Sequence, residues 1–125
     1  FYSDAVLYKA MAEVPAGVNG LRVELGRWAG ALVEVLLDGR RVSLLGWPPY
    51  AAEFDAAPGP HTVGVRVVPP PRNLYGPYHN PSKPRMLATP ASWANPPRQQ
   101  PAGAQYDVLD YGLMENPRIS ARMTP

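Results

Sequence analysis

The sequence predicts an all-β fold, an antiparallel β-sandwich of the jelly-roll type. Short apolar runs alternate with polar residues at period two, which is the pattern of strands with one wet face. These runs recur at intervals of about ten residues with turn residues between them. No window of about 11 residues shows helical apolar spacing free of Gly or Pro. Consecutive hairpins and one long connection suit a jelly roll, and 125 residues predict a single domain over 1–125.

Seven or eight strands are expected. The first four periodic runs cover residues 5–11, 21–25, 31–37 and 42–45. Asp38-Gly39 between the last two runs predicts a tight hairpin turn, because both central residues of that turn need a positive φ. The side chains expected to face the core are Val6, Tyr8, Ala10, Leu21, Val23, Leu25, Val33, Val35, Leu37, Val63, Val65 and Val67.

The valine-rich run 61–68, which begins after Gly59-Pro60, predicts a further strand, and the segments 106–110 and 118–123 predict the last two. Between these strands, residues 69–103 hold ten prolines. A long helix or a central strand cannot pass through that density, because each Pro lacks an N–H and fixes φ. Apolar residues such as Tyr75, Tyr78 and Trp93 can anchor the segment, so we expect an ordered, functional loop.

Composition excludes several classes of protein. Pro 17 and Gly 11 exceed average usage, which indicates many turns. The net charge of +2 is too small to argue for a nucleic acid or a membrane surface as partner. The absence of Cys excludes a disulfide scaffold, a thiolate nucleophile and cysteinyl metal sites. The hydrophobic share of 46% argues against disorder throughout the chain.

The beginning of the chain favours a piece of a longer protein. Phe1-Tyr2-Ser3-Asp4 lacks an initiating Met, a basic n-region and an apolar h-region, so no signal peptide is expected. A strand-like run follows at once, as it would in a C-terminal domain; a mature protein whose leader was removed is the alternative. No run reaches the roughly 18 to 20 apolar residues that span a bilayer. Secreted, periplasmic and cytoplasmic locations are all compatible with these features.

The residues do not assemble into a recognisable catalytic or metal-binding motif. His61 and His79 stand without the Cys or the Asp-rich loop that would complete a ligand set, and His61 is expected to cap a turn. No Ser lies in a Gly-x-Ser-x-Gly elbow. We therefore expect no cofactor and no catalysis by this chain, with an independent hydrolase as the least favoured alternative. A structural calcium ion held by backbone carbonyls is the open alternative for metal binding.

Aromatic residues are the most informative class, with 3 Trp, 7 Tyr and 2 Phe. Flat rings can stack on the C–H faces of sugars while neighbouring polar groups bind the hydroxyls. Trp28 and Trp47 are expected to cover the ends of the sandwich core in preference to touching a sugar. For Tyr75, Tyr78 and Trp93, sugar contact and packing against a neighbouring domain are equal expectations. The candidate carbohydrate-binding or interface residues are Asn73, Tyr75, Tyr78, His79, Trp93, Trp47 and Tyr50.

Several phrases of the sequence resemble one family of domains. The opening Phe1-Tyr2 with Val6-x-Tyr8 and the run Trp28-Ala29-Gly30 through Val33-Glu34-Val35 to Asp38-Gly39 are two of them. The others are Pro49-Tyr50 to Phe54, then Gly59-Pro60-His61 with the valine strand, then Arg72-Asn73-Leu74-Tyr75-Gly76-Pro77-Tyr78-His79-Asn80, and the ending Tyr106-Asp107-Val108-Leu109-Asp110-Tyr111-Gly112-Leu113. Together they resemble the C-terminal galactose-binding-like β-sandwich of bacterial glycoside hydrolases, of the family-2 and rhamnosidase-like enzymes.

The resemblance implies a galactose-binding-like jelly roll that accompanies a catalytic domain. No catalytic acid is carried over, because those of the family belong to a domain outside this chain. The implied function is that of a non-catalytic accessory domain that binds carbohydrate weakly or braces the catalytic domain of its parent glycosidase. The alternative is a purely structural interdomain or protein-interaction domain with no ligand of its own. Neither function involves nucleic acid or a membrane.

Overall fold

The computed structural model describes residues 4–76, 78–79, 89–94 and 98–122. Its secondary structure is mostly antiparallel β-sheet with almost no helix, which confirms the predicted all-β class. The chain divides into two compact units. We call residues 4–69 with 111–122 the sandwich unit, and the described residues of 70–110 the proline-rich unit. No helix in the described ranges has the length and apolar character needed to cross a bilayer.

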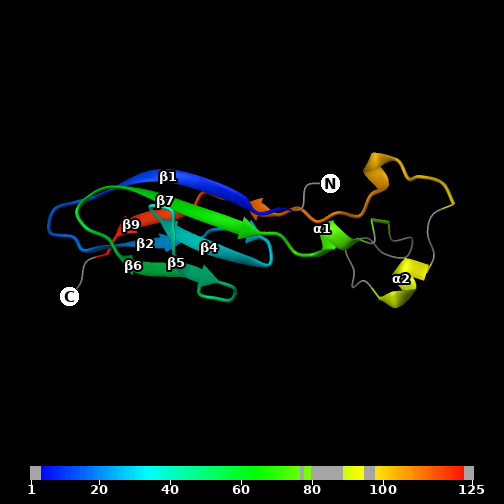
Figure 1. The fold of residues 1–125 in the computed structure, drawn as a ribbon, viewed down its shortest axis with the longest axis horizontal. Helices are drawn as coiled ribbons and strands as arrows, with labels where there is room; N and C mark the ends of the chain where they lie inside the picture. The colour runs from blue at the N-terminus through cyan, green and yellow to red at the C-terminus, as the bar shows by residue number, and fades with distance from the viewer. Residues whose placement is uncertain (1–3, 77, 80–88, 95–97, 123–125) are drawn as a thin grey trace. The chain divides into compact units, whose positions relative to one another are not determined.

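Three antiparallel sheets make up the sandwich unit (Figure 1). The four-stranded sheet has the order β1 (Val6–Val14), β7 (Gly59–Val68), β4 (Leu32–Leu37) and β5 (Arg40–Leu45). The three-stranded sheet has the order β6 (Ala51–Asp55), β2 (Gly20–Glu24) and β9 (Arg118–Ala121). A two-stranded ladder joins β3 (Trp28–Ala29) to β8 (Gly112–Leu113).

One hydrophobic core joins the two larger sheets into a sandwich-like arrangement. Alternate residues of β4 and β7 are buried on one side, and alternate residues of β2 and β6 are buried on the other. The buried hydrophobic side chains are Val14, Leu21, Val23, Leu25, Val33, Val35, Leu45, Ala52, Phe54, Ala56, Val63, Val65 and Val67. The period-two pattern therefore predicted the inward faces of β2, β4 and β7 correctly.

The β4–β5 hairpin turns where the sequence predicted it. Asp38 has a φ of 49° and Gly39 a φ of 83°, so both central residues lie in the region that this tight turn requires. The pairing of β4 with β5 shifts register between Val35 and Leu36, which marks a β-bulge in that ladder.

The expected strand over 106–110 is wrong. These residues are irregular, and the backbone groups of Leu109 bond to the side chain of Asn73 instead of to another strand. The strands β3 and β8 were missed because two residues are too few to show a period. The periodicity analysis also missed β6, where only the family resemblance pointed to a short strand. The last predicted strand holds for β9, and its end at residue 123 lies outside the described residues.

Short helices and buried polar contacts organise the proline-rich unit. Its helices are α1 (Arg72–Tyr75), α2 (Pro90–Ala94) and the 3-10 helix η1 (Gly103–Gln105). Proline suits the start of a helix, because the first N–H groups have no partner within the helix; Pro90 begins α2, and Pro71 caps α1. The guanidinium of Arg72 donates to Asp107 over 2.5 Å, and both side chains are nearly buried.

Candidate functional site

The strongest candidate site is a hollow of about 350 Å³ on the sandwich unit, where β2, β5 and β6 reach their ends near β3. We call it the aromatic hollow. It is lined by Gly26, Arg27, Trp28, Ala29, Gly30, Ala31, Gly46 and Tyr50. Two aromatic rings, an arginine and several exposed backbone groups therefore share one concave surface.

Edge-to-face packing fixes the two rings. The centroids of Trp28 and Tyr50 lie 5.2 Å apart with an interplanar angle of 86°, which is a favourable arrangement for aromatic pairs. Trp28 is held in β3 opposite Leu113, and the carbonyl of Tyr50 accepts a hydrogen bond of 2.9 Å from the Leu25 N–H. Both rings also pack against the core while remaining half-buried.

A glycine makes room for the tryptophan. A Cβ placed on Gly30 would lie 3.2 Å from the Trp28 ring and only 2.7 Å from a Val67 methyl group. The backbone beside Gly30 is also fixed, because the Ala31 N–H donates to the Val68 carbonyl over 2.8 Å. A residue without a side chain is therefore needed at position 30, next to the Trp28 ring.

The rim of the hollow is polar. The side chain of Arg27 is 75% exposed, and its Nε lies 3.5 Å from Oε1 of Glu115. The Arg27 N–H donates to the other oxygen of Glu115 over 3.1 Å. An exposed ion pair of this kind adds little stability, so the guanidinium can exchange it for a polar ligand at low cost.

Trp47 does not cover the core. Its side chain is 77% exposed, so the expectation that it forms a lid is wrong, whereas Trp28 does pack against the core as expected. Trp47 follows Gly46, which lines the aromatic hollow. An exposed third aromatic residue therefore directly follows a residue that lines the aromatic hollow.

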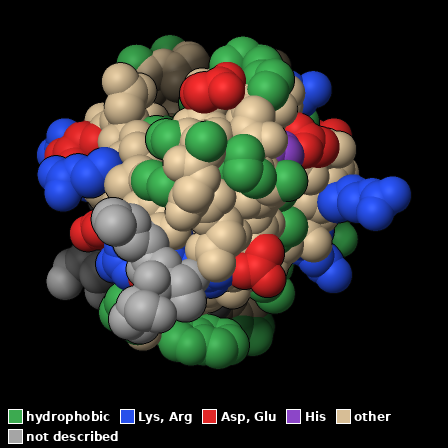
Figure 2. Space-filling view, turned by 90° about the vertical axis from the view of Figure 1, so that its left-hand side faces the viewer, with side chains coloured by type: hydrophobic (Ala, Val, Ile, Leu, Met, Phe, Trp, Pro, Cys, Tyr) green, Lys and Arg blue, Asp and Glu red, His purple; other side chains and the backbone are tan. Residues whose placement is uncertain are grey.

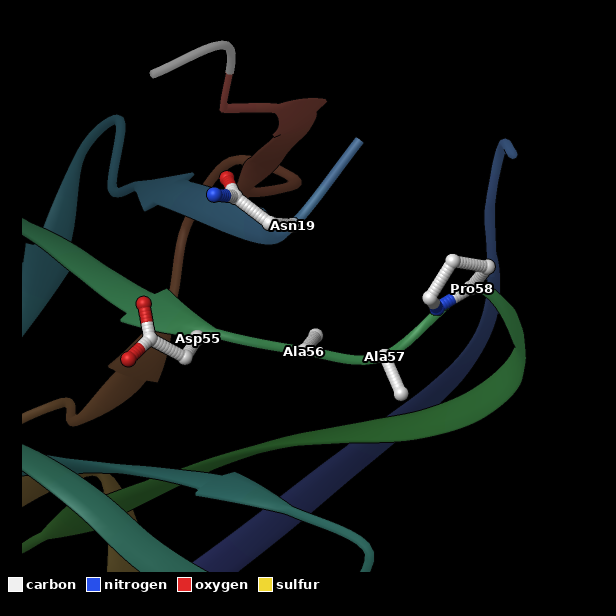
Figure 3. A pocket seen from close by; sticks show the side chains of 5 residues that line it. All are labelled: Asn19, Asp55, Ala56, Ala57 and Pro58. Carbon is white, nitrogen blue, oxygen red and sulfur yellow. The ribbon is translucent and has the colours of Figure 1, made fainter. Parts of the chain in front are cut away.

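A second hollow lies at the other end of β2, before the strand begins. It measures about 450 Å³ and is lined by Asn19, Asp55, Ala56, Ala57 and Pro58 (Figure 3). Asp55 is already hydrogen-bonded to the Arg122 guanidinium, and three of the five lining side chains are Ala or Pro. Figure 2 views this end of the sandwich unit and shows acidic and basic side chains interspersed around its rim. Because most of the lining is apolar and the carboxylate of Asp55 is already bonded, this hollow offers a ligand fewer polar groups than the aromatic hollow does.

A third hollow is an apolar slot of about 400 Å³ beside β1. Its lining residues are Tyr8, Lys9, Ala10, Val63, Val65, Leu113, Asn116, Pro117 and Ile119. The hydroxyl of Tyr8 accepts a hydrogen bond of 3.2 Å from the Leu113 N–H, so this polar group is used within the sandwich unit.

Both ring nitrogens of His61 are used in contacts within the sandwich unit. Its Nδ1 lies 2.6 Å from Oδ2 of Asp38, and its Nε2 lies 2.8 Å from the Ala57 carbonyl oxygen. Oδ1 of Asp38 accepts a bond of 2.8 Å from the Thr62 N–H. The Asp38 carboxylate raises the pKa of His61, and the Thr62 N–H and His61 lower the pKa of Asp38. The pair joins the β4–β5 turn to the start of β7.

The predicted site residues divide between the two units. Trp47 and Tyr50 belong to the sandwich unit, and the other five belong to the proline-rich unit. Asn73 is 5% exposed, and its amide donates to the Leu109 carbonyl over 2.7 Å and accepts from the Leu109 N–H over 2.8 Å. Both ends of its amide therefore position the segment after η1.

The remaining candidates of the proline-rich unit differ in exposure. Tyr75 is 67% exposed at the end of α1. Tyr78 and His79 are half-buried, and the Tyr78 hydroxyl donates to the Leu74 carbonyl over 2.5 Å. Trp93 belongs to α2, and its side chain lies outside the described residues.

Of the three main residues of the aromatic hollow, only Tyr50 was among the predicted site residues: Trp28 was assigned to the core, and Arg27 was missed altogether. The available signal was its place next to Trp28, between two glycines in the gap after a strand. Among the described residues, no group of three or more His, Asp or Glu could hold a metal ion. Comparison of the chain with family models, with curated proteins and with solved structures found no match.

Proposed function

We propose that this chain is a non-catalytic carbohydrate-binding domain, and that the aromatic hollow is its sugar site. The observation that carries the proposal is the pair of half-buried rings, Trp28 and Tyr50, beside the exposed guanidinium of Arg27. Aromatic surfaces pack against sugar C–H groups, and a guanidinium and backbone groups can bind hydroxyls. A volume of about 350 Å³ falls within the usual range for small-ligand sites.

Weak binding is expected from the shape of the site. The hollow is open, and its polar groups are one guanidinium, the hydroxyl of Tyr50, the indole N–H of Trp28 and the backbone. Because few contacts are available to offset the entropic cost of fixing a ligand, we expect a dissociation constant in the millimolar range. This corresponds to a free energy of binding of about −4 kcal/mol.

The parent protein that we propose is a glycoside hydrolase. The support is the resemblance of the Arg72–Asn80 and Tyr106–Leu113 phrases to the galactose-binding-like jelly rolls of those enzymes. In that setting the domain holds the enzyme near its polymeric substrate, and bond cleavage takes place in another domain.

Titration of the chain with soluble mono- and oligosaccharides, followed by NMR, tests the proposal. We expect shifts of the Trp28 indole N–H and of the amides of residues 26–31, and Arg27→Ala should weaken binding about tenfold. Arg40→Ala, which removes another exposed arginine elsewhere on the unit, is the matched control and should bind normally. Shifts confined to residues 72–79 would contradict the assignment to the aromatic hollow.

The second candidate function is an interdomain brace. The exposed Leu74 and Tyr75 of the proline-rich unit favour it, with 52% and 67% of their surfaces exposed. Exposed neighbouring apolar side chains are typical of surfaces that a partner covers. If no sugar shifts any resonance at high concentration, the carbohydrate function is wrong and this function is favoured.

A further inference from the structure

Strand β1 offers an open edge to another strand. It is nine residues long, and within the described residues it pairs on one side only, with β7. An open edge of this length presents a row of backbone donors and acceptors that another strand can use.

Leu7, Lys9, Met11 and Glu13 form the outer face of β1, whereas Tyr8, Ala12 and Val14 pack toward the core. Met11 is 72% exposed, which is unusual for a large apolar side chain in the middle of a strand. Lys9 and Glu13 stand two residues away from it, one on each side. A charge, an apolar group and the opposite charge therefore follow one another along this face.

The other charges at the middle of this face already have partners. Oε2 of Glu34 accepts from Arg66 over 2.7 Å, and its Oε1 accepts from Arg41 over 3.0 Å. These two arginines hold the pKa of Glu34 below its usual value. Arg66 of β7 and Arg41 of β5 thus already share the carboxylate of Glu34 on β4 as their partner.

Lys9 and Glu13 are different. Among the described residues neither makes an ion pair or a side-chain hydrogen bond, and Glu13 acts on His61 only through its charge, which helps to raise the pKa of that imidazole. Two opposite charges on one open edge, neither held in an ion pair or a hydrogen bond, are complementary to a strand that carries the same pattern in reverse. That strand is β1 of a second copy.

We propose that two copies of this chain associate through β1, antiparallel, with the two-fold axis at Met11. This register places Lys9 of each copy opposite Glu13 of the other copy, and Met11 opposite Met11. Residues directly opposite each other in an antiparallel pair share a face, so each copy adds its four-stranded sheet to that of the other.

Neighbouring registers are less favourable. An axis at Lys9 would set the two lysines against each other, and an axis at Glu13 would set the two carboxylates against each other. An axis at Ala10 would place Leu7 opposite Glu13, which leaves both charged groups without a partner. Only the axis at Met11 satisfies both charges, because like charges directly opposite each other destabilise a strand pair.

The other edge strands are protected. The ladder of β5 with β4 is interrupted by the bulge, and Arg40 and Arg41 begin β5. On β6, Glu53 is held by Arg22 over 2.6 Å. Strand β9 has only four residues. Within the sandwich unit, β1 is therefore the edge on which length, exposure and unpaired charge coincide.

Sedimentation equilibrium of the 125-residue chain over about 1 µM to 1 mM tests the proposal. We expect a concentration-dependent dimer that weakens as salt is added. Lys9→Glu and Glu13→Lys each turn both cross-strand pairs into like-charge pairs and should raise the dimer dissociation constant about tenfold or more. Arg40→Glu makes the same charge change at the opposite edge strand and should leave the dimer intact.

Mixing the two single variants gives the sharpest test. In a mixed dimer, the carboxylate introduced at position 9 of one copy faces the ammonium introduced at position 13 of the other. The unchanged Glu13 of the first copy faces the unchanged Lys9 of the second, so all pairs are again attractive. The mixture should therefore dimerise, and so should the double variant Lys9→Glu/Glu13→Lys.

Three results would overturn the proposal. The first is a wild-type chain that stays monomeric at the highest concentration. The second is a pair of single variants that dimerise as the wild type does, and the third is a mixture of them that stays monomeric. Circular dichroism verifies that each variant is folded, so that loss of the dimer is not mistaken for loss of the fold.

Discussion

Asp38 and His61 bond to each other, and each makes one further hydrogen bond to the backbone. Oδ2 of Asp38 faces Nδ1 of His61, and Oδ1 accepts from the Thr62 N–H. The second ring nitrogen of His61 faces the carbonyl of Ala57. Both acceptors favour the protonated imidazole, because only that form donates from both nitrogens. The stabilisation that these hydrogen bonds give the β4–β5 turn therefore depends on pH.

The pH dependence has a defined sign. The pKa of His61 is raised above 6.5 in the folded chain, so its stabilising effect is complete below pH 6.5 and is lost as pH rises through the folded value. The pKa of Asp38 is lowered below 3.8, so its effect is present above pH 3.8 and is lost as pH falls through the folded value. The pair stabilises the fold most between these two limits.

His61→Gln measures this effect. Gln keeps hydrogen-bonding capacity but carries no charge at any pH. We expect the wild-type chain to melt at a higher temperature than the variant near pH 5.5, and the difference should shrink as pH rises to about 9. Thermal unfolding at a series of pH values checks it. A difference that is constant or that grows with pH would contradict the assigned protonation.

The contacts of individual residues explain why the site was only partly predictable. Trp28 and Trp47 look alike in sequence, since each follows a strand and adjoins small residues. Their environments differ because Trp28 lies in β3 and pairs with Leu113, whereas Trp47 lies in no strand of the part of the chain that the structure describes. Asn73 likewise looks like a ligand-binding amide until its contact with Leu109 places it in the backbone network. Such contacts join positions far apart in sequence, and no local pattern encodes them.

At the scale of elements, most strands with a clear period were predictable; β6 alternates but was missed, and the two-residue strands have no period to detect. Valine alternation identified β4 and β7, and Asp38-Gly39 identified the hairpin between β4 and β5. The segment 106–110 alternates as well but forms no strand, because Asn73 and the Tyr78 carbonyl bind its backbone groups. Alternation shows which residues share a face but does not show what their amides bind.

The turn between β3 and β4 illustrates an element that depends on one missing Cβ. Gly30→Ala would bring its new methyl group to 2.7 Å from Val67 and 2.8 Å from the Val68 carbonyl oxygen. Neither neighbour can move freely, since Val67 is fully buried. We expect a loss of about 1–3 kcal/mol in the free energy of unfolding, measured with urea.

Gly46→Ala is the matched control, because a Cβ there meets nothing within 4 Å. Its free energy of unfolding should stay close to that of the wild type, or rise slightly as the unfolded chain loses freedom. Equal losses in the two variants would show that the close approach at Gly30 does not restrict the turn.

At the scale of the whole molecule, the residues of the hydrophobic core all precede the proline-rich unit in the chain. They run from Val14 to Val67, and Leu113 and Ile119 add to them from the far side of that unit. The residues of the sandwich unit just before and just after residues 70–110 both pair with the short segment 29–32. Val68 pairs with Leu32, and Gly112 pairs with Ala29. The sandwich unit thus has a core of its own, and a short connection can join residue 69 to residue 111.

Replacing residues 70–110 with a short Gly-Ser linker should therefore leave a folded sandwich unit. Shortening the connection lowers the entropic cost of closing it by about 1 kcal/mol, so the free energy of unfolding should not fall. Urea unfolding followed by circular dichroism would show a single cooperative transition, and NMR would show the dispersed amides of a folded sheet. Because the aromatic hollow belongs to the retained residues, the shortened chain should also keep the sugar-induced shifts of Trp28. An unfolded product would mean that the core of the sandwich unit needs residues 70–110 for its stability.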